Sequence, residues 1–260
     1  MSTDATWVGS MPEAYDRLLG PVKFTPYAKE LALRAAAFGP RDVLELAAGT
    51  GLLTRELTGL GARVTATDLN PPMVAWGSEH VLGASWAVAD ARALEFPDDV
   101  FDVVACGFGV MFFPDRVAAF TEAGRVLREG GALVFSVWDA VERVPFTRDL
   151  YEELQARYPD DPPDFFVRVP YGYHDPAVIE ADARAAGFRQ VVVEHVPLTT
   201  TAPSAASYVD GYCFGTPLRF ALAERGDLEV AARELGARMT ERWGDGPIEQ
   251  QMSAYVVSCL

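Results

Sequence analysis

One short segment, residues 43–54, most constrains what this chain can fold into. It reads VLELAAGTGLLT: an apolar run, then a turn with two glycines, then the start of a helical pattern. Glu45 lies inside the apolar run, where an unpaired charge would be costly to bury. A second β-like run, residues 63–67, ends at Asp68. Doubly wound α/β proteins bind ligands at the carboxyl ends of such strands, so this segment predicts a ligand site.

Strand and helix patterns alternate along the chain. Seven strands are predicted, at residues 43–46, 63–67, 84–88, 102–107, 132–138, 190–196 and 254–259. Helices are predicted at residues 11–19, 26–38, 51–59, 71–78, 115–128, 176–186 and 227–243. This alternation favours an α/β fold, a doubly wound and mostly parallel sheet with helices on both faces.

The length and hydrophobicity of the chain allow a single domain. It has 260 residues, half of them hydrophobic, so one compact unit can bury a sizeable core. We expect an N-terminal helical cap at 1–40 and a ligand-binding core at 41–140. Residues 141–175 and 197–253 do not fit the alternation, and we expect them to form a lid over the strand ends. The alternative is that they only decorate the surface of the core.

The charge balance and the cysteines limit which partners the protein is expected to have. The chain has 37 acidic and 22 basic residues, a net charge of −15, which argues against nucleic acid and anionic membranes as partners. Its three cysteines are widely spaced and form no CxxC pair, so we expect no metal site and no disulfide framework. The N-terminus has no signal-peptide pattern. We therefore expect a cytoplasmic protein; the oligomeric state stays open.

Motifs between residues 40 and 140 resemble those of class I S-adenosylmethionine-dependent methyltransferases. They are VLELAAGTG at 43–51, DLNPPM at 68–73, ADA at 89–91 with LEFP at 94–97 and FDVV at 101–104, and GRVLREGGAL at 124–133. The resemblance is greatest to the branch that acts on small molecules, including quinone-ring C-methyltransferases. It implies S-adenosyl-L-methionine as the cofactor and a Rossmann-like, seven-stranded sheet with an antiparallel last strand.

The resemblance also implies which residues bind the cofactor. Glu45 would complement the cofactor's ammonium group, Asp68 would accept hydrogen bonds from the ribose hydroxyls, and Asp90 would meet the adenine amino group. Alternatives are a strand charge that reaches solvent for Glu45 and helix caps for the two aspartates. Tyr15 would cover the sulfonium side, with core packing as its alternative. The other expected contacts are Ala47, Gly49, Gly51, Leu69, Met73, Ala91 and Cys106. Ala47 replaces a glycine common in the family, so we expect a negative φ there.

The acceptor pocket is expected at the same strand ends. Its predicted walls are aromatic, and core packing is the alternative for each of them: Phe108, Phe112, Trp138, Tyr173 and Tyr212. His174, just before a predicted helix start, is a candidate general base near neutral pH. We predict instead that it only helps to position the acceptor.

These features together predict a methyltransferase that transfers a methyl group to O, N or C of a small, apolar or aromatic acceptor. A non-catalytic S-adenosylmethionine-binding protein is the main alternative. A nicotinamide-dependent oxidoreductase is less favoured, because Thr54 stands where a dinucleotide fingerprint has its third glycine.

Overall fold

A single seven-stranded sheet organises the computed structural model, which describes residues 5–260. Its strand order is β3-β2-β1-β4-β5-β7-β6. The strands are β1 (Asp42–Glu45), β2 (Arg63–Asp68), β3 (Ala84–Val88), β4 (Phe101–Gly107), β5 (Leu127–Trp138), β6 (Val191–Ala202) and β7 (Ile248–Cys259). Strands β1 to β5 pair in parallel, whereas β7 is antiparallel to both β5 and β6. The predicted fold class, including its antiparallel last strand, is confirmed.

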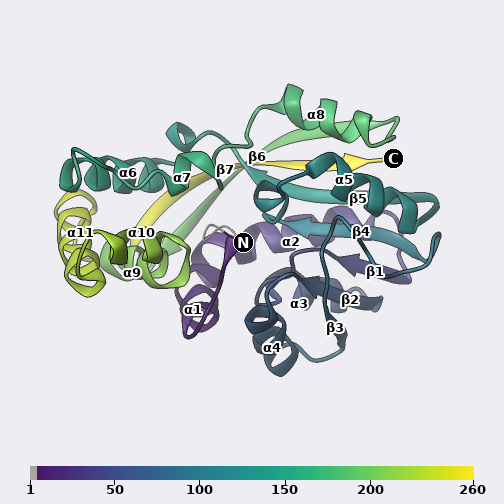
Figure 1. Cartoon of the computed structure of the whole chain (residues 1–260), viewed down its shortest axis with the longest axis horizontal. Coiled ribbons are helices and arrows are strands. Elements are labelled where there is room, and N and C mark those ends of the chain that lie inside the picture. Colours follow the sequence, from purple (N-terminus) through teal and green to yellow (C-terminus); the bar gives the residue numbers. More distant parts are fainter. Residues whose placement is uncertain (1–4) are drawn as a thin grey trace.

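Two apolar layers hold helices against the sheet. On β4, Val103 packs with α2 (Thr25–Ala36) and α3 (Leu52–Thr58), whereas Val104 belongs to the core on the opposite face. That alternation is the period of two expected for a strand buried on both sides. The opposite face carries α5 (Arg116–Val126) and α8 (Pro176–Ala185), while α4 (Pro71–His80) packs beside β2 and β3 (Figure 1).

The N-terminal segment forms one helical run and not the two separate helices that we predicted. It begins with α1 (Met11–Ala14), continues as the π-helix η2 (Tyr15–Phe24) and joins α2 without a break. Pro21 lies inside η2. The run continues because wider π-type turns accommodate Pro21 while Leu19 and Val22 stay buried. Residues 1–4 of the predicted cap lie outside the described residues.

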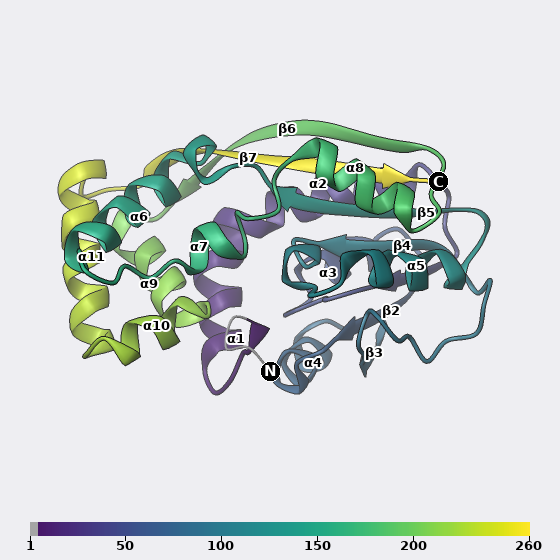
Figure 2. The ribbon, with the colours of Figure 1, turned by 45° about the horizontal axis from the view of Figure 1, so that its top comes forward.

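A second group of helices stands beyond one end of the sheet. It comprises α6 (Pro145–Arg157), α7 (Phe165–Arg168), α9 (Ala205–Gly215), α10 (Leu218–Glu224) and α11 (Leu228–Trp243). Figures 1 and 2 show β6 and β7 running from the sheet into this group. Both strands are longer than predicted because they continue to pair with each other past the end of β5, up to the pair Ala202 and Ile248.

The remaining short helices are η3 (Val110–Phe112) and η4 (Val141–Arg143). Among the described residues, none of the helices is both long and apolar enough to cross a membrane. Helix α9 packs against η2, so the second group of helices meets the N-terminal run above the carboxyl ends of β4 and β5 (Figure 2).

Candidate functional site

The turn after β1 requires an unusual backbone. Gly49 and Gly51 have φ of 56° and 89°, and a Cβ on Gly51 would lie 2.7 Å from a methyl group of Val81. Ala47 also has a positive φ, 50°. Our expectation of a negative φ at Ala47 was therefore wrong, because the turn needs a left-handed backbone conformation there. The alanine methyl group makes this conformation locally strained.

Glu45 lies deep at the end of β1, and its side chain is 1% exposed. The Thr54 hydroxyl, from α3, donates a hydrogen bond of 2.6 Å to it. None of the ion pairs among the described residues involves this carboxyl. Burial raises its pKa to about 8, opposed by the Thr54 bond and assisted by the nearby Asp68 charge. Glu45 therefore does not reach solvent. Its buried carboxyl has no cationic partner among the described residues, and a cationic group of a ligand would supply one.

A small cavity lies beside Glu45; the centre of a water molecule can occupy about 40 Å³ of it. Two hydroxyls among its lining residues, Thr50 Oγ1 and Ser136 Oγ, are buried and have no hydrogen-bond partner among the described residues. Buried polar atoms in native proteins are normally paired. An acid next to two unpaired hydroxyls suits a ligand that brings both an ammonium group and a carboxylate.

Asp68, at the end of β2, lines an adjoining larger cavity of about 390 Å³. Its Oδ1 accepts a hydrogen bond of 2.8 Å from the Asn70 backbone amide, and its Oδ2 accepts one of 2.9 Å from the Gly49 amide. Burial raises the pKa of Asp68 despite these bonds. The N-cap of α4 is Asn70 and not Asp68. The helix-cap alternative therefore does not explain why this carboxylate is buried beside a cavity.

Asp90 lies in another part of the same cavity wall, in the loop after β3. It is tied to Arg92, whose guanidinium donates bonds of 3.0 and 2.7 Å to its two oxygens and holds the pKa of Asp90 below its ordinary value. The same cavity is lined by apolar residues that we expected around the adenine ring: Leu69, Met73 and Ala91. Cys106 is buried and is not among the lining residues of the cavities described here.

These residues fit S-adenosylmethionine group by group. Glu45 would suit its ammonium, Thr50 and Ser136 its carboxylate, Asp68 the ribose hydroxyls, and the apolar wall its adenine. The two cavities share Tyr15, Ala47, Gly49, Gly107 and Phe108, so one extended molecule can occupy both. We refer to them together as the donor cavity.

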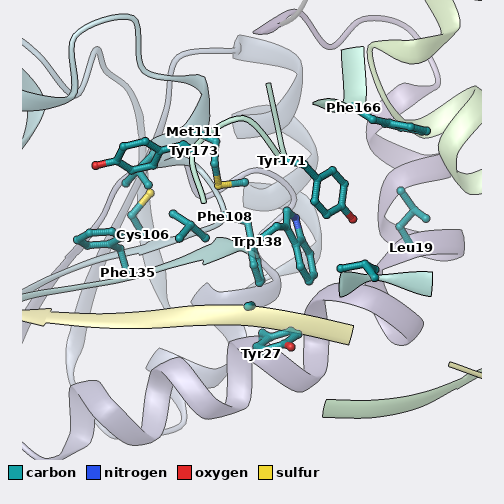
Figure 3. Close-up of a cluster of buried hydrophobic side chains, with 14 of the residues drawn as sticks. Leu19, Tyr27, Cys106, Phe108, Met111, Phe135, Trp138, Phe166, Tyr171 and Tyr173 are labelled. Atoms are coloured by element: carbon teal, nitrogen blue, oxygen red, sulfur yellow. The ribbon is translucent and has the colours of Figure 1, made fainter. Parts of the chain in front are cut away.

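A third cavity, the acceptor cavity, has a volume of about 50 Å³ and adjoins the donor cavity at Trp7, Tyr15, Phe108 and Phe112. Its wall is mostly aromatic: Phe108 stacks on Trp138 with ring centroids 3.9 Å apart. Tyr212 and Tyr171 also line it, and Figure 3 shows Tyr171 beside Trp138. The cavity therefore offers flat apolar faces next to the place where the donor would end.

The structure brings together four of the predicted acceptor residues, namely Phe108, Phe112, Trp138 and Tyr212, but leaves two outside the cavity lining. The Tyr173 hydroxyl donates a hydrogen bond of 2.9 Å to Asp182, and its ring lies away from Trp138 (Figure 3). His174 Nδ1 lies 2.7 Å from the Tyr171 backbone oxygen. Neither residue is among those lining the acceptor cavity. Tyr171, from the same loop, lines it instead.

Besides Thr50, Ser136 and Tyr171, sequence reasoning missed two further residues at the site. Trp7 lines both the donor and the acceptor cavities, and its ring contacts Phe112 edge-on. Lys23 lines the acceptor cavity although its side chain is 3% exposed. A signal for Lys23 was present: it follows the buried Leu19 by four residues, so both lie on the same face of the helical run.

Comparisons with known proteins show which domain and which fold the chain resembles. Residues 44–135 match the family model described as a methyltransferase domain. A demethylmenaquinone methyltransferase of Mycobacterium marinum is 43% identical over 117 residues, which cover 45% of this chain and 48% of that protein. The chain matches about half the length of such curated relatives.

Solved structures share the fold over most of the chain. One match is a structure from Anaeromyxobacter dehalogenans described as a putative type II methyltransferase. The alignment covers 91% of this chain and 96% of that protein, with a TM-score of 0.60 and 21% identity. An N-methyltransferase of Haemonchus contortus, solved with phosphomonomethylethanolamine and S-adenosylhomocysteine, covers the whole chain with a TM-score of 0.61 and 17% identity, over 60% of its own length. Residues 44–135 therefore match a methyltransferase domain, and the chain as a whole shares its fold with these solved structures.

Proposed function

We propose that this protein transfers a methyl group to an O, N or C atom of a small, apolar or aromatic acceptor. The single observation that carries the proposal is the junction of the donor and acceptor cavities at Trp7, Tyr15, Phe108 and Phe112. When bound, S-adenosylmethionine supplies an electrophilic methyl group that needs no further activation. The protein then has to align the acceptor and exclude water, which can be worth about 7–11 kcal/mol.

Each part of the site has a role in this proposal. Glu45 and Asp68 hold the donor at its two polar ends. Phe108 has a positive φ of 56°, a strained conformation that places its ring between the donor and acceptor cavities. The stacked Phe108 and Trp138 rings offer a flat surface to the acceptor, and Tyr15 closes the junction from the N-terminal run. These contacts explain acceptor selection by shape and low polarity.

The proposal is tested first by binding and then by turnover. Calorimetry should show that the protein binds S-adenosylhomocysteine and not NAD. Radiolabelled methyl transfer should then be measured against a panel of phenols, amines and naphthols; naphthols are included because relatives carry the name demethylmenaquinone methyltransferase. Tight S-adenosylhomocysteine binding without transfer to any acceptor would favour the non-catalytic alternative.

The cell compartment and the partners belong to the same proposal. We propose a cytoplasmic protein whose partners are small molecules and not nucleic acid. Support comes from the net charge of −15 and from Cys106, Cys213 and Cys259, which are all buried as free thiols. A strongly acidic surface offers no basic field for a phosphate backbone.

A further inference from the structure

Lys23 is an unusual group to find in the wall of an aromatic cavity. Its Nζ lies 2.9 Å from the Tyr171 hydroxyl, 3.0 Å from the Tyr212 hydroxyl and 3.9 Å from the centre of the Trp138 ring. The Thr147 hydroxyl lies 3.1 and 2.7 Å from the two tyrosine hydroxyls. The four polar groups therefore form a closed ring of hydrogen bonds, with Lys23 on the side of the acceptor cavity.

Among the residues that the structure describes, no carboxylate forms an ion pair with Lys23. None of the ion pairs recorded for residues 5–260 includes it, and burial alone holds its pKa well below the ordinary value for lysine. The titratable groups that face it are Tyr171 and Tyr212, with Tyr15 on its own helix lining the same cavity. Burial raises the pKa of all three phenols. The tyrosines therefore stay neutral, and the group of the cavity that can gain a proton is the Lys23 amine.

That this residue is a lysine and not an arginine matters because only a lysine can gain and lose a proton here. Only two of the 22 basic residues in the chain, Lys23 and Lys29, are lysines, and the others are arginines. An arginine keeps its proton in proteins, whereas a buried lysine can lose it and regain it. A neutral amine also avoids placing an unpaired cation next to a cationic methyl donor. Of lysine and arginine, the cavity thus carries the one that can work as a base.

Resting on the function proposed above, we propose that Lys23 accepts the proton of an acidic hydroxyl on the methyl acceptor, which is a phenol or enol with a single ring. The acceptor's O–H bond breaks, an N–H bond forms at Nζ, and the electron pair stays on the acceptor. The resulting anion pairs with the new ammonium, while Tyr171 and Tyr212 continue to hold Nζ. The increased electron density on the acceptor's oxygen, or on a ring carbon conjugated with it, makes the acceptor a better nucleophile.

The size of the cavity supports one ring. Its volume of about 50 Å³ open to water centres holds roughly three to five waters, at about 10–15 Å³ for each. At about 30 Å³ of liquid per water, this corresponds to roughly 100–150 Å³, the scale of a six-membered ring with one substituent. The stacked faces of Phe108 and Trp138 match a planar ring.

The probe for this proposal is 4-nitrophenol, which absorbs visible light only as its phenolate. It is titrated with pH in the presence of the protein saturated with S-adenosylhomocysteine. In the wild type and in Lys29→Met, whose lysine is exposed on α2, we expect bound 4-nitrophenol to ionise at least about one pH unit lower than free, a tenfold effect. In Lys23→Met this shift should disappear. The matched ligand 4-nitroanisole has no hydroxyl and should bind equally to all three proteins.

A second measurement does not depend on the folding of Lys23→Met. With ¹⁵N at the lysine Nζ, the wild type gives only two side-chain signals, and Lys29→Met assigns them. Lys23 should titrate well below the ordinary range of lysine, and addition of 4-nitrophenol should move its signal to the shift of an ammonium. The proposal is overturned if Lys23 titrates in the ordinary range of lysine, if bound 4-nitrophenol keeps its solution pKa, or if 4-nitrophenol fails to bind at millimolar concentration. Failure of the proposed function alone would appear differently, as absence of methyl transfer to any acceptor with the 4-nitrophenol shift intact.

Discussion

Binding of the methyl donor at pH 7 is expected to release nearly one proton from Glu45. Because burial raises the pKa of this carboxyl to about 8, about nine-tenths of the free protein carries the proton at pH 7. A ligand ammonium beside the carboxylate favours its charged form and lowers the pKa again. The proton then leaves, so about 0.9 protons should be released from this group for each ligand bound.

The same shift makes binding and stability depend on pH. Between pH 6 and pH 8 the ionised fraction of Glu45 in the free protein rises from about 0.01 to about 0.5, so affinity should rise about 50-fold, or about 2.3 kcal/mol. The free protein should behave in the opposite way. Because the folded state holds this proton more tightly than the unfolded state, the free energy of unfolding falls as pH rises from about 4.5 to about 8.

Glu45→Gln separates this effect from the titration of the ligand itself. Calorimetry with S-adenosylhomocysteine at pH 7, in phosphate and in Tris buffers, measures the number of protons released. The wild type should release about 0.9 more protons than the glutamine variant, which should also lose the stability slope below pH 8. Equal proton release by the two proteins would refute the assignment of Glu45 to the ligand's ammonium group.

Other residues of the site give further expectations. Asp68→Ala should weaken S-adenosylhomocysteine binding by about 1–3 kcal/mol in calorimetry, and unchanged affinity in a folded variant would exclude the ribose contact. Tyr15→Ala should weaken donor and acceptor binding together, since Tyr15 lines both cavities; an effect on neither would make this residue core packing only. Ala47→Gly should stabilise the protein by up to about 1 kcal/mol in urea unfolding, as the relief of a left-handed alanine exceeds the added chain entropy; a lower midpoint would contradict this. His174→Ala should keep turnover within about tenfold, or 1.4 kcal/mol, because its ring is bonded to the Tyr171 backbone away from the cavity lining; a loss of several thousandfold would show general-base catalysis.

The core of the fold could be predicted from local signals. Strand β1, the turn at Gly49 and Gly51, and the acid at the end of β2 are consecutive in sequence and obey short-range rules of periodicity and backbone conformation. The donor residues are therefore readable in order along the chain. The positive φ of Ala47 was not readable, because a single alanine carries no sign of the conformation that its turn imposes.

The acceptor cavity was predicted less well because it is assembled from distant segments. Lys23, Thr147, Tyr171 and Tyr212 come from four separate elements or loops, and only tertiary packing brings each polar atom within 3.1 Å of two of the others. A choice between Tyr171 and Tyr173 depends on which ring a loop turns inward. Local pattern carries no information on that orientation.

The long pairing of β6 and β7 decides how the acceptor can enter and leave. The two strands pair without a shift of register from Val191 and Cys259 to Ala202 and Ile248, and they carry α9 and α11 directly at their far ends. A hinge between the helical group and the sheet would have to break this ladder, which is costly for each buried hydrogen bond lost. We therefore expect traffic through the site to depend on side-chain rotations and on the loop that carries Tyr171, with the two halves of the molecule keeping a fixed orientation throughout turnover.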